Sequence, residues 1–213
     1  AFLTTTTTNS QQHQRKQVLI LGGGYDTLAL RLAPQFPHVR FVEVNHPSVA
    51  KTKHPAMETL MGGPPSGNLR LVSADWTHLI QLQQEEQQQS SSLSSLLLPS
   101  FSETDVNSTD PPSTSTIVVM EAELMYLSED QVRNLFSELS VLSSAKVMKV
   151  AFDYLGSRND MTPSPFQWAV NPRSLQQFFA EDERTKRWNV TQQPAKVGLT
   201  HCALVSTEHA LSN

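Results

Sequence analysis

The sequence predicts an α/β fold built on a doubly wound, mostly parallel sheet, and three observations support this prediction. Apolar strand-like runs alternate with helix-like segments along the chain. The apolar run Val18–Leu21 leads directly into the glycines Gly22–Gly24, as expected for a buried parallel strand followed by a sharp turn. Polar residues follow three further apolar runs, at Asn45, Asp75 and Glu121. In such a sheet, ligands bind at the carboxyl ends of the strands.

The elements of the first half follow from apolar runs and helix-start signals. Proline suits the first turn of a helix, where its missing N–H group is not needed. In chain order we expect a strand at 18–21, a helix at about 27–32, a strand at 39–44, a helix beginning at Pro47 and a strand at 68–72.

The second half contains the most regular helix pattern in the chain. Ser128 and Gln131 have the spacing of a capping box. An apolar stripe with helical periodicity follows, formed by Val132, Leu135, Phe136, Leu139 and Leu142. Around this helix we expect strands at 116–120 and 146–152, a short helix at 175–179, and a closing antiparallel pair at 188–191 and 203–207.

Composition limits the domain organisation and the compartment. The 213 residues suffice for one α/β domain but not comfortably for two. We expect a flexible lead-in at residues 1–16 and a single domain at 17–213 with a disordered surface insertion at 81–112, which is rich in Gln, Ser, Glu and Pro. One cysteine, Cys202, excludes an internal disulfide framework and fits a reducing compartment, so we expect a cytoplasmic protein.

Charge and residue spacing disfavour several classes of partner. The net charge of −4 gives no basic surface for nucleic acid. No apolar run is long enough to cross a bilayer, so we expect no membrane association. The seven histidines, including His46 and His78, show no metal-ligand spacing with carboxylates or cysteine, so we expect no metal site.

The glycine loop and the polar strand ends indicate a nucleotide-type cofactor. A dinucleotide fingerprint requires a third glycine where this chain has Thr27, and the carboxylate of Asp26 would repel a pyrophosphate. S-adenosylmethionine carries a sulfonium cation and no phosphate, so the loop favours it over NAD, which remains the alternative.

Four stretches together resemble the leucine carboxyl methyltransferase family of S-adenosylmethionine-dependent enzymes. They are Gln17–Leu32, Phe41–Lys53, Leu71–Leu79 and Ile117–Tyr126. The resemblance covers about residues 1–154 apart from the insertion, and it implies a Rossmann-like class I methyltransferase fold. Because the chain begins with Ala1, at what looks like the end of the helix preceding the glycine loop, we expect a fragment that lacks the N-terminal helices. The activity of such a fragment is left open.

The resemblance also implies a set of cofactor contacts. The glycines approach the cofactor, Asn45 faces the ribose, Asp75 and Trp76 flank the adenine, and Glu121 contacts the methionine portion. Family members usually have aspartate where this chain has Asn45, and Glu43 on the same strand could compensate. The expected cofactor-binding residues are therefore Gly22, Gly23, Gly24, Glu43, Asn45, Asp75, Trp76 and Glu121. From the residues alone, Asp75 could equally cap the helix that follows it.

The family acceptor is the C-terminal leucine carboxylate of the protein phosphatase 2A catalytic subunit. A carboxylate is already ionised at neutral pH, so its methylation needs alignment and no general base. Tyr126 and Tyr154 follow strand ends and are the candidates for orienting the acceptor, although packing roles would also explain them. The alternatives are a small-metabolite O-methyltransferase, the tRNA-modifying branch of the family, and a cofactor-binding remnant without activity.

Overall fold

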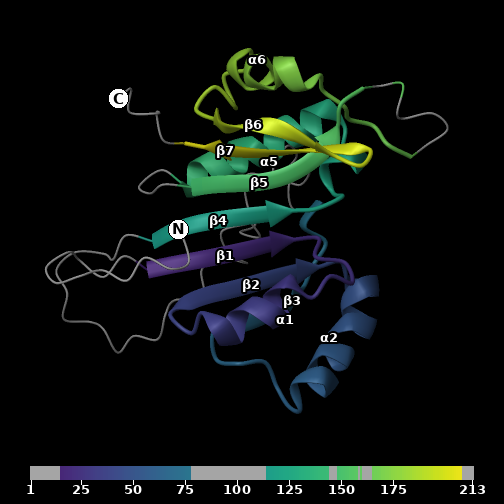
Figure 1. The fold of residues 1–213 in the computed structure, drawn as a ribbon, viewed down its shortest axis with the longest axis vertical. Helices are drawn as coiled ribbons and strands as arrows, with labels where there is room; N and C mark the ends of the chain where they lie inside the picture. The colour runs from purple at the N-terminus through teal and green to yellow at the C-terminus, as the bar shows by residue number, and fades with distance from the viewer. Residues whose placement is uncertain (1–14, 78–113, 144–147, 158, 160–164, 208–213) are drawn as a thin grey trace, which may run out of the picture.

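Seven strands form one sheet in the order β3-β2-β1-β4-β5-β7-β6 (Figure 1). The computed structural model describes residues 15–77, 114–143, 148–157, 159 and 165–207. The predicted insertion at 81–112 and nearly all of the predicted lead-in at 1–16 lie outside these residues. The first strand begins at Arg15, within the predicted lead-in.

Six of the seven strands run in the same direction, and β7 alone runs in the opposite direction. β1 pairs in parallel with β2 and β4, β3 pairs in parallel with β2, and β5 pairs in parallel with β4. β7 is antiparallel to both β5 and β6. The predicted doubly wound, mostly parallel sheet with a closing antiparallel pair is therefore confirmed. The strands are β1 Arg15–Leu21, β2 Val39–Asn45, β3 Leu69–Ser73, β4 Thr114–Met120, β5 Met148–Leu155, β6 Asn189–Val197 and β7 Thr200–Ser206.

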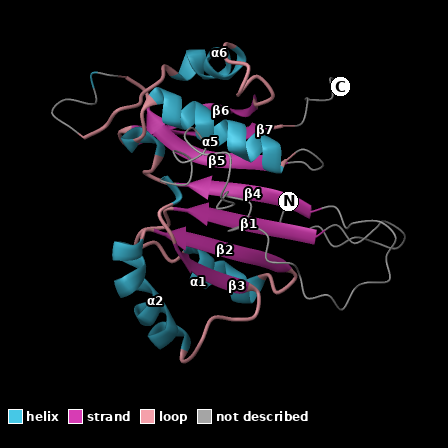
Figure 2. Cartoon of the chain, turned by 180° about the vertical axis from the view of Figure 1, so that it is seen from behind, coloured by secondary structure: helices cyan, strands magenta, loops and turns pink. Residues whose placement is uncertain are grey.

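Helices cover both faces of the sheet. Figure 1 shows α1 in front of the sheet, and Figure 2, taken from behind, shows α5 in front of it. The predicted capping box is present, because the Ser128 side chain accepts from the Gln131 N–H and the Gln131 side chain accepts from the Ser128 N–H. The helical segments are α1 Leu28–Leu32, η1 Ala33–Gln35, α2 Pro47–Met61, η4 Leu124–Tyr126, α5 Glu129–Leu142, η6 Pro172–Ser174 and α6 Leu175–Ala180.

Successive residues of each central strand enter two different cores. Val18 and Ile20 of β1 pack with α1 and α2, whereas Leu19 and Leu21 pack on the opposite face with α5 and α6. This alternation follows from the two-residue period of a strand. It explains why the run Val18–Leu21 is apolar at every position, because both faces of this part of β1 are buried.

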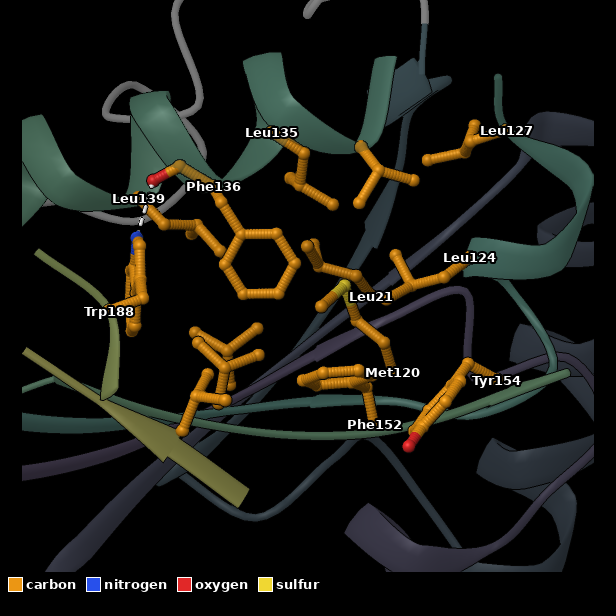
Figure 3. Close-up of a cluster of buried hydrophobic side chains, with 14 of the residues drawn as sticks. Leu21, Met120, Leu124, Leu127, Leu135, Phe136, Leu139, Phe152, Tyr154 and Trp188 are labelled. Carbon is orange, nitrogen blue, oxygen red and sulfur yellow. Dashed lines mark hydrogen bonds between the residues drawn. The ribbon is translucent and has the colours of Figure 1, made fainter. Parts of the chain in front are cut away.

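Phe136 of α5 is the centre of the larger core (Figure 3). Its ring centroid lies 4.8 Å from that of Phe179, 5.3 Å from that of Trp188 and 5.6 Å from that of Phe152, all in edge-on arrangements. The indole N–H of Trp188 donates to the Phe136 carbonyl at 2.9 Å, so this buried polar group is satisfied. Packing and hydrogen bonding therefore join α5, α6, β5 and the residue before β6 at Phe136.

We expect Phe136→Ala to lower the free energy of unfolding by about 3–5 kcal/mol, because it leaves a cavity and removes three aromatic contacts. Urea denaturation followed by far-UV circular dichroism measures this change. Val141→Ala is the control on the same helix, since Val141 is 64% exposed, and it should change stability by less than about 0.5 kcal/mol. Equal effects of the two substitutions would contradict the central role of Phe136.

Candidate functional site

A cavity of about 330 Å³ lies at the carboxyl ends of the parallel strands. Its walls come from the segments that follow β1, β2, β3 and β4, which the parallel register brings to one edge of the sheet. Its volume is within the range of small-molecule sites. The lining residues are Gly22, Gly24, Asn45, His46, Val49, Asp75, Trp76, Thr77 and Glu123. Five of the eight predicted cofactor residues are among them.

The glycine loop requires glycine at two positions. Gly22 has φ of +70° and Gly24 has φ of +49°, a conformation that residues with a Cβ rarely adopt. A Cβ on Gly22 would also lie 2.0 Å from the carboxyl carbon of Glu123. Gly22 therefore allows both the turn and the close approach of the Glu123 side chain.

A buried ion pair lies behind this loop. Lys53 of α2 and Glu43 of β2 are 4% and 1% exposed, and their Nζ and Oε1 atoms are 2.7 Å apart. The same Oε1 accepts from the Asn45 amide at 2.6 Å. The Lys53 ammonium also donates to the Gly23 carbonyl at 3.3 Å. Glu43 and Gly23 thus support the cavity from behind and do not line it, and Glu43 is already engaged by Lys53 and Asn45.

Asn45 presents an unpaired acceptor. Its side chain is 1% exposed and lines the cavity, yet its Oδ1 has no hydrogen-bond partner among the described residues. A buried acceptor without a partner costs free energy, so this oxygen suits a ligand that brings a donor. A ribose hydroxyl is such a donor.

Asp75 and Trp76 follow β3 and form the next part of the wall. Oδ1 of Asp75 accepts from the Thr77 N–H at 3.1 Å and from its hydroxyl at 2.6 Å, which is the capping role that the sequence left open. Its Oδ2 lies 3.7 Å from Nε2 of His46. Trp76 is 3% exposed and joins the larger core.

His46 lines the cavity and caps α2, whereas the sequence suggested only a surface histidine. Its ring is exposed but lines the cavity. It is also the N-cap of α2, because its Nδ1 accepts from the Ser48 N–H at 3.3 Å. This role follows from its position between the end of β2 and Pro47, a signal that the sequence does contain.

Glu123 is the acidic lining residue that sequence reasoning missed. Ala122 has φ of +56°, and its N–H donates to Oδ1 of Asp153 at 2.6 Å. After this turn Glu123 lines the cavity, where its carboxylate accepts no hydrogen bond from any described residue. Burial, together with the negative charge of Asp153, raises the pKa of Glu123 to about 7.

Three predicted residues lie away from the cavity. Glu121 is exposed and lines a separate hollow of about 340 Å³ together with Asp153 and Cys202.

Tyr126 is 47% exposed and packs edge-on against Phe166. Tyr154 is fully buried between Phe152 and Trp168, and its hydroxyl has no partner among the residues described. Burial raises the Tyr154 pKa, and the charge of Cys202 adds to that effect. The structure shows no contact between these two tyrosines and the cavity.

Within the described part of the chain, no group of three or more histidine, cysteine, aspartate or glutamate side chains is arranged to hold a metal ion. None of its helices combines the length and the apolar character needed to span a bilayer.

Residues 1–94 match the family model described as leucine carboxyl methyltransferase. The resemblance expected from the sequence is therefore confirmed over this range, which contains the glycine loop and the ends of β2 and β3. No curated protein sequence matches the chain.

Solved structures match over most of the chain at low sequence identity. The pyocyanin biosynthetic protein PhzM matches with a TM-score of 0.53 and 11% identity over 91% of this chain and 50% of its own. The O-methyltransferase NcsB1 from neocarzinostatin biosynthesis matches with a TM-score of 0.52 and 13% identity over 89% of this chain and 48% of its own. That structure contains S-adenosylmethionine and 2-hydroxy-5-methyl naphthoic acid. The 8-amino-8-demethyl-D-riboflavin dimethyltransferase RosA from Streptomyces davawensis matches with a TM-score of 0.54 and 11% identity over 89% of this chain and 49% of its own.

These likenesses show a fold of the class I methyltransferase type. The chain spans about half the length of the solved structures it matches.

We expect Glu123→Gln to stabilise the fold above pH 7 by on the order of 1 kcal/mol. The pKa of Glu123 is raised from 4.5 to about 7 in the folded state, so stability of the wild type falls as pH rises through this window. The glutamine variant lacks this loss, and its advantage should vanish near pH 4.5. Melting temperatures of both proteins from pH 4.5 to 8 test this, with Glu121→Gln at the exposed neighbouring glutamate as the control. A difference that does not vary with pH would refute the assignment.

Proposed function

Because residues 1–94 match the leucine carboxyl methyltransferase family, we propose that the chain binds S-adenosylmethionine and forms the core of a carboxyl O-methyltransferase. The observation that carries the proposal is the unpaired Oδ1 of Asn45 in a cavity that glycines and two acidic side chains also line. The features of this cavity complement both ends of the cofactor.

Two groups of residues that line the cavity differ in chemistry. Asn45 offers an acceptor to ribose hydroxyls, and Trp76 and Asp75 beside it offer an apolar and a polar wall for adenine. Glu123 and Gly22 lie together in the same cavity, and the Glu123 carboxylate lacks a cationic partner among the described residues. We therefore assign the cationic, methionine end of the cofactor to Glu123, a role that the family resemblance had implied for Glu121.

When bound, S-adenosylmethionine would supply an electrophilic methyl group on its sulfonium sulfur: the acceptor oxygen would form a bond to the methyl carbon as the bond from that carbon to sulfur breaks, with S-adenosylhomocysteine as the leaving group. The chain's own residues contribute alignment and charge. A carboxylate acceptor is ionised at neutral pH, so no side chain has to remove a proton. Holding the reacting groups at near-attack distance can supply most of the rate.

We propose the C-terminal leucine carboxylate of the protein phosphatase 2A catalytic subunit as the acceptor. The support for it is the family match. Tyr126 offers an exposed aromatic ring, backed by Phe166, that suits a leucine side chain. Tyr154 lies fully buried, so we propose that it supports this end of β5 by packing.

A small-molecule hydroxyl acceptor is the second candidate, and the local charge favours it. Glu123 lines the cavity, the charge of Asp153 acts on it, and neither carboxylate is joined to a cation by an ion pair in the described part of the chain. An anionic acceptor would be repelled there. A hydroxyl group would instead lose its proton to a base, and the Glu123 pKa of about 7 suits that role.

We expect S-adenosylhomocysteine at 100 times its Kd to stabilise the protein by about 2.7 kcal/mol. For a chain of this size the melting temperature should then rise by roughly 5–10 °C, whereas NADH should have no effect. Gly22→Ala should abolish the rise, because its Cβ would displace Glu123.

Gly62→Ala is the matched control. Gly62 has the same φ of +70° but nothing within 4 Å of an added Cβ, so the variant should keep the response to S-adenosylhomocysteine. A rise with NADH in place of S-adenosylhomocysteine would overturn the cofactor assignment.

Methyl transfer separates the two acceptor classes. With radiolabelled S-adenosylmethionine, we expect a peptide with the C-terminal sequence of the phosphatase subunit to gain a base-labile methyl ester, and the same peptide amidated at its C-terminus to gain none. The rate should be nearly flat from pH 6 to 8, because the acceptor needs no base. Transfer to phenols alone, with a rate that rises through pH 7 and falls on Glu123→Gln, would support the second candidate. Cofactor binding without transfer to either acceptor would indicate a binding module.

A further inference from the structure

The Asn45 amide is held by one of its two ends. Its Nδ2 donates to Oε1 of Glu43 at 2.6 Å, and its Oδ1 is left for the cavity. An amide has nearly the same shape after a half turn, so shape alone does not choose between the two orientations. The choice depends on what Glu43 can do as a hydrogen-bond partner.

Lys53 determines whether the Glu43 side chain accepts or donates hydrogen bonds. Its ammonium lies 2.7 Å from the same Oε1 that Asn45 contacts, and both side chains of the pair are buried. A carboxylate paired with an ammonium only accepts hydrogen bonds. An unpaired buried carboxyl group takes up a proton instead, and as an acid it could donate to the amide oxygen and turn the amide around.

We propose that Lys53 is a positioning residue which, through Glu43, keeps the oxygen of Asn45 facing the cavity and so makes the site select ligands with a hydroxyl donor. The orientation follows from the geometry alone, and only the identity of the ligand rests on the proposed function. The second contact of Lys53, to the Gly23 carbonyl at 3.3 Å, ties the glycine loop to the same cation. The Lys53 ammonium thus holds both the glycine loop and, through Glu43, the Asn45 amide, although Lys53 itself does not line the cavity.

A purely structural role of the ion pair between Lys53 and Glu43 predicts different properties for variants that lack its charges. An ion pair that only fills space can be replaced by apolar side chains with little loss of stability. The positioning role predicts that removing both charges restores the fold and leaves the amide free to turn. The variants are Lys53→Met, Lys53→Arg and the double variant Glu43→Gln/Lys53→Met. Lys51→Met is the matched control, since Lys51 is exposed on the same helix.

The first test needs no ligand. In ¹⁵N-correlated NMR spectra, we expect the two side-chain amide protons of Asn45, assigned by their loss in Asn45→Asp, to be widely separated and slow to exchange. Lys51→Met and Lys53→Arg should keep this signature, whereas the double variant should lose it while remaining folded. A wild-type-like signature in the double variant would overturn the proposal.

The second test measures selectivity by calorimetry. S-adenosylhomocysteine should bind Lys53→Met about tenfold more weakly than the wild type, and the double variant several-fold more weakly. At least one of the 2′-deoxy and 3′-deoxy analogues should bind the wild type about tenfold more weakly than the parent compound. That penalty should shrink in both variants, which a loss of stability alone would not produce. An unchanged penalty in a folded double variant would overturn the proposal.

The two tests also separate this proposal from the proposed function. If the wild type fails to bind S-adenosylhomocysteine, the cofactor assignment is wrong. The amide signature then still decides whether Lys53 orients Asn45, because that measurement uses the ligand-free protein.

Discussion

The buried ion pair between Lys53 and Glu43 is the contact on which the candidate site depends. Two charges removed from water are costly unless each is well paired, and here the pair lies 2.7 Å apart with a further donor and a further acceptor nearby. It joins α2, β2 and the glycine loop at one point. The position of the loop and the orientation of Asn45 are therefore consequences of a single electrostatic constraint.

The sheet provides the frame in which this constraint can act. Because β1 pairs in parallel with both β2 and β4, the residues that follow all three strands meet at one edge. The aromatic cluster around Phe136 lies on the opposite side of the sheet from α1 and α2. The aromatic contacts of Phe136 involve α5, α6 and β5, whereas the polar contacts that support the cavity involve β2, α2 and the glycine loop.

Local patterns were enough to predict most of the fold and part of the site. The apolar runs, the capping box of Ser128 and the glycine loop all act over a few neighbouring residues, and all three were predicted. Glu123 could not be predicted, because the left-handed turn at Ala122 reverses which of two nearby glutamates faces the cavity. The burial of Tyr154 depends on the pairing of β5 with β7, which links residues far apart in the sequence. The cation that engages Glu43 lies on the next helix, and strand periodicity alone does not reveal it.

The turn at Ala122 combines a strained backbone conformation with a defined direction for the Glu123 side chain. A left-handed conformation costs a residue with a Cβ about 1–2 kcal/mol, and here the Ala122 N–H gains a bond to Asp153 in return. Glycine at this position would relieve the strain but would also admit many more backbone conformations. A more stable protein and a less well-directed carboxylate would then arise from the same substitution, so thermal stability is a poor guide to the quality of this site.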